Sequence, residues 1–213
     1  MLDSRETITK AILRSQHCQR NWDLSQEIPE EDLELLYTAA TQCPSKQNVA
    51  FYKAHFILNR NLIEQIHEKT MGFTTREGHT TNTQILANLV VVLEEHVDLS
   101  KDTIYRNEET DKILSGVDTG KSEKTLNIDK HMAVGVAAGY LNLTASMLGY
   151  STGCCACFDA EGVKEILNLE NYPLLLMGIG FKDPSLNRRV HHLDHNFIFP
   201  TKSKQSITIN VIR

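Results

Sequence analysis

The most constraining feature of this chain is the stretch of residues 131–184, where an apolar helical pattern, two glycines, a short helical pattern and an apolar run follow one another. In its first part, apolar residues recur three or four positions apart, a spacing that gathers them into one stripe on a helix. Gly135 and Gly139 lie beside the stripe and leave room for another helix to approach. The pattern predicts a buried, tightly packed central helix. Its apolar stripe consists of Val134, Ala137, Ala138, Leu141, Ala145 and Leu148.

The rest of this stretch predicts three further features. Gly149 and Gly153 flank Tyr-Ser-Thr, and glycine reaches backbone conformations that other residues avoid, so we expect the helix to stop there in a turn. Asp159 can cap a short helix over residues 160–169. The apolar run 174–181 predicts a buried strand. We therefore expect the order helix, glycine turn, helix, strand.

The remaining chain carries the helical and strand patterns of an α/β domain. At 213 residues it is long enough for one such domain with a substantial core, and neither a repeat nor a low-complexity segment divides it. We expect a single domain over residues 1–213. Apolar periodicity predicts helices over 7–16, 30–42 and 61–70, and strands over 51–58 and 86–93.

Two segments differ from the rest of the chain. Residues 94–130 contain ten acidic and six basic residues with little periodicity, which predicts a surface excursion. A lid that sets substrate specificity is the alternative there. In the C-terminal extension, residues 196–213, apolar Ile207, Ile209 and Val211 alternate with polar residues in a strand pattern. A late strand needs a sheet edge to pair with, and an edge on a second subunit would serve.

Composition limits the classes of partner and compartment. The formal net charge of -5 argues against nucleic acid as the main partner, because duplex-binding proteins usually carry a basic face. The first residues lack the apolar core of a signal peptide, and the longest apolar run, 85–93, is too short to span a bilayer, so we expect no membrane association. The five cysteines lack the spacing of a disulfide framework. We therefore expect reduced thiols in a cytoplasmic protein.

Short polar loops at helix ends carry the candidate binding groups, because the sequence lacks a Walker or Rossmann glycine loop, a zinc-binding histidine pair and a nucleophile elbow. The loops offer guanidinium, imidazole and amide groups and free backbone N–H groups. Such groups suit a cofactor with one phosphate and a hydrogen-bonding ring system. The basic C-terminal part, 182–213, also favours a small anionic ligand, with a solvated tail as the alternative. The polar loops are residues 16–20, 44–48, 151–153 and 187–189.

Three blocks of the chain resemble the FMN-dependent nitroreductase family, in the family's order and spacing and over nearly the whole length. The first block, residues 16–22, reads Gln-His-Cys-Gln-Arg-Asn-Trp and is similar to the motif that binds the phosphate and ribityl chain of FMN. His17 and Arg20 match that motif. Gln16 replaces an arginine of the family and Cys18 replaces a serine, and the loss of the arginine removes a bidentate phosphate contact.

The second block, residues 43–52, is similar to the Pro-Ser-x-x-Asn loop that lies at the flavin in the family. Pro44, Ser45 and Asn48 match this loop. The residues of the block that depart from the family pattern are Lys46, Ala50 and Phe51.

The third block is the stretch 131–184 itself, which resembles the family's long central helix, glycine-containing turn, short capped helix and strand. Thr152 and Gly153 fall in the turn. Arg188 and Arg189 follow the block, where the family often has a basic residue on the FMN phosphate.

The resemblance implies a fold, a cofactor and a reaction. The fold would be α+β, a three-layer α/β/α arrangement with a mostly antiparallel sheet, in an intertwined homodimer whose C-terminal strand joins the partner's sheet. NADH or NADPH would pass a hydride to N5 of FMN, and a small acceptor such as a nitroaromatic or a quinone would then take it in a ping-pong cycle that needs no catalytic side chain. The cofactor-binding residues so implied are Gln16, His17, Cys18, Arg20, Pro44, Ser45, Lys46, Asn48, Thr152, Gly153, Arg188 and Arg189.

Three alternatives remain open at the level of sequence. A specialised relative could use reduced flavin for other chemistry. Gln16, Cys18 and Ala50 motivate a non-catalytic dimer that kept the fold and lost tight FMN binding. A thiol-metal protein is the third alternative, with candidate ligands Cys154, Cys155, Cys157, His191, His192 and His195.

Overall fold

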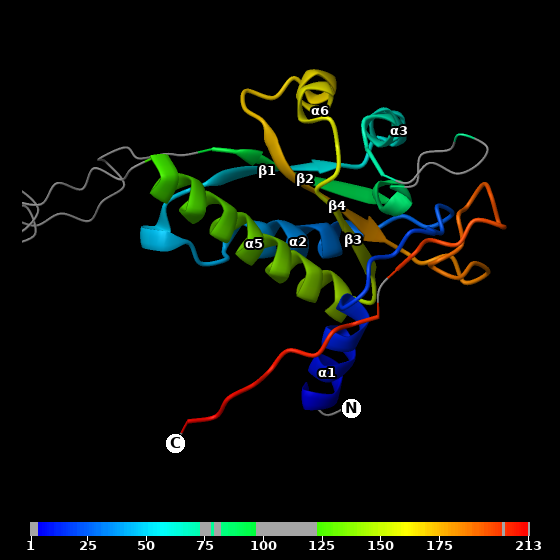
Figure 1. Cartoon of the computed structure of the whole chain (residues 1–213), viewed down its shortest axis with the longest axis horizontal. Helices are drawn as coiled ribbons and strands as arrows, with labels where there is room; N and C mark the ends of the chain where they lie inside the picture. The colour runs from blue at the N-terminus through cyan, green and yellow to red at the C-terminus, as the bar shows by residue number, and fades with distance from the viewer. Residues whose placement is uncertain (1–3, 73–77, 79–81, 97–122, 202, 213) are drawn as a thin grey trace, which may run out of the picture.

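The computed structural model describes residues 4–72, 78, 82–96, 123–201 and 203–212. Within these residues four strands form one sheet in the order β1, β2, β4, β3, so that β1 and β3 are its edges (Figure 1). Every neighbouring pair is antiparallel, as the resemblance implies. The strands are β1 (Tyr52–Ile57), β2 (Leu89–Glu95), β3 (Ser151–Cys155) and β4 (Pro173–Gly180).

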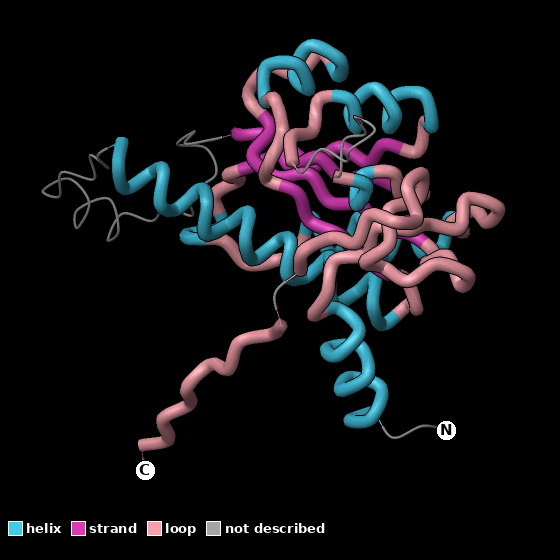
Figure 2. Tube along the Cα trace, turned by 45° about the vertical axis from the view of Figure 1, so that its right-hand side comes forward, coloured by secondary structure: helices cyan, strands magenta, loops and turns pink. Residues whose placement is uncertain are grey.

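Helices cover both faces of the sheet, as Figures 1 and 2 show. Helices α2 and α5 pack on the face formed by Leu89, Val91 and Leu93, and helices α3 and α6 pack on the face formed by Val90 and Val92. Alternate residues of a strand point to opposite faces, so β2 is buried on both sides. This arrangement confirms the predicted three-layer fold. The helices are α1 (Ser4–Ser15), α2 (Glu30–Thr41), α3 (Arg60–Glu68), α5 (Glu123–Met147) and α6 (Ala160–Leu167).

The predicted central helix is α5, and it is apolar on two sides. Its inner side buries Val134, Ala137, Leu141 and Ala145 of the predicted stripe against the sheet and α2. Its other side carries exposed apolar residues three or four positions apart, which we call the outer apolar row. Exposed apolar residues gathered on one side of a helix are typical of an interaction surface. The outer apolar row consists of Ile128, Met132, Val136, Tyr140, Leu143 and Met147.

The segment after α5 corrects one prediction. Gly149 ends the helix with a φ of 102°, but the expected turn at residues 151–153 is the first part of β3. Gly153 lies inside this strand. A Cβ at this position would come within 2.6 Å of the Gln84 Cβ, so the packing requires glycine here. At Gly178, its partner in β4, a Cβ would come within 2.0 Å of the Gln84 carbonyl oxygen. Both glycines therefore allow the 3-10 turn η2 (Thr83–Ile85) to pack closely on the sheet.

The other predicted boundaries hold to within a few residues. Asp159 caps α6, its carboxylate accepting a hydrogen bond from the Gly162 N–H at 3.1 Å, as predicted. The helix ends before the predicted residue 169 because Asn168 takes a left-handed conformation with a φ of 50°. The predicted surface excursion over 94–130 is too wide. Its middle, 97–122, lies outside the described residues, but residue 94 is buried in β2 and residues 123–130 belong to α5.

The C-terminal extension leaves the body of the domain (Figures 1 and 2). A single bridge between Val190 and Ile198 ties its start to the preceding loop. Further on, Ile207, Ile209 and Val211 are 79%, 82% and 72% exposed. The predicted terminal strand therefore has no sheet partner among the described residues of its own chain. Pairing with a second subunit stays a prediction.

Candidate active site

The first polar loop runs along the free edge of β3. The Gln19 N–H donates to the Thr152 carbonyl at 2.8 Å, and Cys18 Sγ lies 4.0 Å from the Cys154 carbonyl oxygen. Gln16 and His17 precede this contact and are exposed. The sequence-predicted residues of this loop and of β3 are thus brought together by backbone contacts.

Arg20 is the positively charged residue of this loop, and its side chain is partly buried. Its guanidinium carbon lies 4.7 Å from the centroid of the Phe199 ring. Its Nη1 is buried and has no hydrogen-bond partner among the described residues. Burial lowers the pKa of Arg20, the charge of Cys18 opposes this shift, and the positive charge of Arg188 adds to it. A buried guanidinium N–H without a partner is costly, and an anionic ligand would satisfy it.

The loop after β4 joins the same group. Asn21 donates from Nδ2 to the carbonyls of Asn187 at 2.7 Å and Val190 at 2.8 Å, which fixes this loop beside Arg20. The two predicted arginines between them differ in burial: Arg188 is half-buried and Arg189 is exposed. Three guanidinium groups therefore lie on neighbouring segments, a donor set that suits a phosphate.

Strand β3 supplies the predicted site residues Thr152 and Gly153. Thr152 is buried and its hydroxyl hydrogen-bonds Asn142 of α5, while Gly153 lies under Gln84. Gln84 is a polar residue that the sequence reasoning missed. Its Nε2 donates to Asn82 Oδ1 at 3.2 Å, and its Oε1 is buried without a partner among the described residues. No local pattern marks this glutamine, because its environment comes from strands that are distant in sequence.

The remaining predicted residues lie elsewhere. The loop after α2 packs near the start of α5, where Lys46 Nζ lies 3.0 Å from Asp129, whereas Thr152 contacts Asn142 near the other end of that helix. These two positions of α5 are thirteen residues apart, about 20 Å along the helix. Within one chain, Pro44, Ser45, Lys46 and Asn48 are therefore separated from the other predicted site residues.

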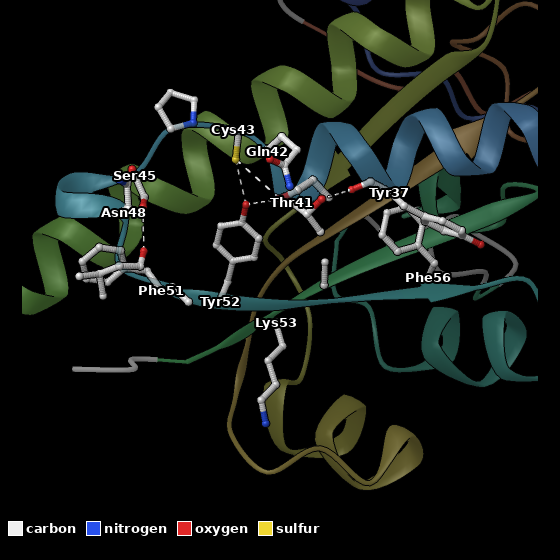
Figure 3. Close-up of a pocket in the computed structure, with 15 residues that line it drawn as sticks. Tyr37, Thr41, Gln42, Cys43, Ser45, Asn48, Phe51, Tyr52, Lys53 and Phe56 are labelled. Carbon is white, nitrogen blue, oxygen red and sulfur yellow. Dashed lines mark hydrogen bonds between the residues drawn. The ribbon is translucent and has the colours of Figure 1, made fainter. Parts of the chain in front are cut away.

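That loop borders a groove of about 860 Å³ between α2 and the edge strand β1 (Figure 3). Tyr52 points from β1 toward Cys43, with its hydroxyl 2.9 Å from the thiol, while Lys53 points to the opposite face of the sheet. Burial and the neighbouring thiol raise the pKa of Tyr52, so its hydroxyl stays protonated. Strand β1, which lines the groove, is an edge of the sheet formed by the described strands.

The cysteines do not assemble a metal centre in the described part of the chain. All five are free thiols, and these residues include no cluster of three histidine, cysteine or acidic side chains that could hold a metal ion. Burial raises the pKa of Cys154 to about 11, which disfavours the thiolate that a metal would bind. The thiol-metal alternative therefore gains no support. The described helices also include none that is long and apolar enough to cross a membrane.

Comparison with solved structures identifies the fold. A protein of Staphylococcus epidermidis described as an NAD(P)H:FMN oxidoreductase is 20% identical, with 88% of this chain and 90% of that chain covered and a TM-score of 0.65. A protein of Exiguobacterium sibiricum described as a nitroreductase in complex with FMN is 16% identical, with 88% and 91% covered and a TM-score of 0.65. A nitroreductase family protein of Streptococcus pneumoniae is 17% identical, with 83% and 91% covered and a TM-score of 0.63.

No curated protein sequence matches the chain. The family profile described as "Nitroreductase family" matches residues 13–181, most of the domain. Members of this family bind FMN, which agrees with the cofactor implied by the sequence motifs. The chain therefore belongs to the nitroreductase family, as the resemblance of its three motif blocks indicated.

Proposed function

We propose that this chain is an FMN-dependent oxidoreductase that uses NADH or NADPH to reduce a small electron-poor acceptor such as a nitroaromatic or a quinone. The observation that carries the proposal is the buried Nη1 of Arg20, which has no hydrogen-bond partner among the described residues and lies close to the charge of Arg188. When bound, FMN supplies the hydride transfer between the nicotinamide and the acceptor.

In this proposal the loops around β3 hold the phosphate end of FMN. Arg20 donates to the phosphate, and Arg188 and Arg189 add positive charge from the neighbouring loop. Gln16, where the family motif has arginine, bonds instead to the Leu13 carbonyl at 2.9 Å at the end of α1. The phosphate therefore depends more strongly on Arg20 than it would with an arginine at position 16.

We propose that the site is completed by a second copy of the chain. Within one chain, the Pro44–Ser45–Asn48 loop and β3 contact α5 at positions about 20 Å apart along the helix, so a second copy would be needed to bring these two parts of the site together. In a two-fold dimer each surface patch meets its own copy, so the far loop of one subunit can reach the near loops of the other. The outer apolar row of α5 provides an apolar surface for such a contact, with Met132 65% and Tyr140 47% exposed.

The same dimer would give the C-terminal extension a sheet edge with which to pair. Its alternating Ile207, Ile209 and Val211 match the needs of a strand added to a sheet edge, and β1 offers a free edge beside the groove of about 860 Å³. We therefore propose that the extension of one subunit pairs with β1 of the other. This pairing would bury apolar side chains that are otherwise exposed. Such burial would stabilise the dimer by roughly 25 cal/mol for each Å² of apolar surface removed from water.

The protein's own contribution to the reaction is binding and orientation. The group around Arg20 contains no nucleophile paired with a general base in its described residues, and hydride transfer through a flavin requires none. The five free thiols suit a reducing compartment, and we propose the cytoplasm.

The test is the visible absorption spectrum of the purified protein after FMN is added and the excess removed. We expect flavin bands at about one FMN per chain, anaerobic bleaching by NADH or NADPH, and recovery of the bands on addition of a nitroaromatic or a quinone. Bound FMN that neither nicotinamide can bleach would contradict the proposed donor. A colourless protein that refuses FMN would contradict the whole proposal.

A second candidate is a non-catalytic dimer with weak FMN binding, which the exposed and locally bonded Gln16 favours. Gln16→Arg discriminates between the two. In an enzyme with an intact phosphate site, this change should tighten FMN binding by about tenfold, the effect of one charge-assisted hydrogen bond. In a non-catalytic dimer with weak FMN binding the change should also increase FMN uptake, but neither NADH nor NADPH should bleach the bound flavin.

A further inference from the structure

Lys46 makes a two-pronged contact with a buried carboxylate. Its Nζ lies 3.0 Å from both Oδ1 and Oδ2 of Asp129. The Asp129 side chain is 6% exposed and that of Lys46 is 49% exposed. A carboxylate buried to this extent requires compensation by positive charge and hydrogen bonds. The Lys46 amine is therefore directed into the subunit, toward α5.

The loop that carries Lys46 is otherwise held by bonds within itself. Ser45 Oγ donates to the Val49 carbonyl at 2.8 Å, and the Asn48 N–H donates to the Ser45 carbonyl at 3.3 Å. Asn48 has a φ of 56°, a left-handed conformation that is unfavourable for a residue with a Cβ. Among the described polar contacts of residues 44–50, the pair with Asp129 is the one that reaches another element.

Asp129 occupies a particular place on α5. It follows Ile128, the first residue of the outer apolar row, which is 50% exposed. Successive residues of a helix point about 100° apart, so the ion pair holds the loop on the flank of α5 between its buried side and the outer apolar row, which we assign to the second subunit. Loss of the ion pair would let the loop move and would displace Asn48 relative to that surface.

We infer that Lys46 is a positioning residue, which holds Ser45 and Asn48 toward the flavin of the second subunit through its ion pair with Asp129 and does not itself bind the flavin. This inference rests on the proposed FMN site and names the device that orients its second half. It reassigns Lys46, which the sequence resemblance placed among the cofactor ligands.

The test is a double-mutant cycle on FMN affinity, measured by titration of flavin fluorescence. We expect Lys46→Met and Asp129→Asn each to weaken FMN binding by about tenfold, and the double variant to bind no more weakly than the weaker single variant. Lys46→Arg should retain affinity to within about threefold, because it preserves the ion pair. Loss of affinity in Lys46→Met with none in Asp129→Asn would overturn the inference and make Lys46 a direct ligand.

A second measurement requires no flavin. In the FMN-free protein we expect the Asn48 and Val49 amides to exchange with solvent about tenfold faster in Lys46→Met than in wild type. The matched control is Glu170→Gln, which removes the contact of Glu170 with Lys53 elsewhere on β1 and should change neither exchange nor FMN affinity. Asp129→Asn removes the buried charge and leaves Lys46 half-exposed, so this variant should fold even if Lys46→Met, which leaves the buried carboxylate without its cation, does not.

The outcomes separate this inference from the proposed function. Wild-type protein that fails to take up FMN would contradict the proposed function. Wild-type protein that binds FMN, together with unchanged affinity and exchange in Lys46→Met, would contradict the role of Lys46 alone. A lower melting temperature with unchanged FMN affinity would show a purely structural ion pair and would also contradict it.

Discussion

The guanidinium of Arg20 lies over the ring of Phe199, 4.7 Å from its centroid, so a residue near the start of the domain and one near its end meet at one place. Phe199 is 2% exposed and therefore forms a fixed support for the cation. A cation stacked on an aromatic ring is held in orientation while its remaining N–H groups stay available. In the proposed site, the orientation of Arg20 toward the phosphate would thus depend on the chain beyond β4 as well as on the N-terminal motif.

Arg20→Ala should raise the FMN dissociation constant about tenfold or more, since a charge-assisted hydrogen bond contributes ~1.5–3 kcal/mol. Phe199→Leu should produce a smaller loss, because it keeps the apolar support and removes the cation–π interaction of about 1 kcal/mol. Fluorescence titration with FMN measures both. Lys10→Ala, at an exposed position of α1 paired with Glu6, is the control and should leave affinity unchanged. Equal affinity in Arg20→Ala and wild type would remove Arg20 from the site.

His67 of α3 should make the fold less stable in mild acid. Burial, followed by the positive charges of His191 and Arg60, lowers the pKa of His67 to about 4. Between this value and the unfolded pKa of about 6.5, the unfolded chain binds more protons than the native one, so stability is full above pH 6.5 and falls as the pH decreases toward 4. The expected loss from this residue is about 2 kcal/mol at pH 5.

Urea unfolding of wild type and His67→Gln at pH 7 and pH 5 measures this loss in the free energy of unfolding. The variant cannot bind the proton, so its stability should fall less between the two pH values. The control is His195→Gln, at an exposed position, which should retain the wild-type difference. The same pH dependence in wild type and His67→Gln would show that other groups cause it.

Tyr150 should contribute more to stability through its hydroxyl than an exposed tyrosine does. Its side chain is 3% exposed and its hydroxyl donates to the carboxylate of Asp32 in α2. Tyr150→Phe would leave that carboxylate without this donor, at a cost of about 1–3 kcal/mol. Tyr172→Phe removes a similar bond to Glu161 at a 47% exposed position and should cost less than about 0.5 kcal/mol. Thermal unfolding of both variants compares them, and equal effects would contradict a special role for the buried bond.

Val136 lies in the middle of the outer apolar row and tests the proposed dimer. We expect wild type to sediment as two chains and Val136→Lys as one, because a lysine there would bring two charges into an apolar contact. Leu24→Lys, at a 52% exposed position in the loop before α2, is the matched control and should remain dimeric. The monomeric variant should also lose FMN, because its site would be incomplete. A dimeric Val136→Lys would place the interface on another surface.

Ile209→Asp probes the C-terminal extension separately. If the extension pairs with β1 of the second subunit, a charge at this alternating apolar position should weaken the dimer at low protein concentration without unfolding the domain. Sedimentation over a range of concentrations measures this. An unchanged dissociation constant would leave the extension outside the interface.

Much of the fold could be predicted because its signals are local. The 3.6-residue spacing of Val134, Ala137 and Leu141 indicates a buried helical face wherever that helix packs, and the Asp159 cap depends on neighbours in sequence. The missed strand shows the opposite case. The sequence predicts a turn at Gly153 because glycine permits turns. In the structure this glycine instead permits the close approach of Gln84, a residue that lies nearby only once the sheet has formed.

The candidate site divides in the same way. By itself the sequence determined the motif residues and the family, because Arg20, Pro44, Ser45 and Asn48 keep their order and spacing along the chain. The tertiary structure decided which of them meet. It placed Arg20 beside β3 and the loop after β4, and it placed the Pro44 loop at a position on α5 about 20 Å from the contact of that helix with β3. The direction of a side chain such as Lys46 depends on a partner 83 positions later in sequence, and contacts of this kind exist only once the chain has folded.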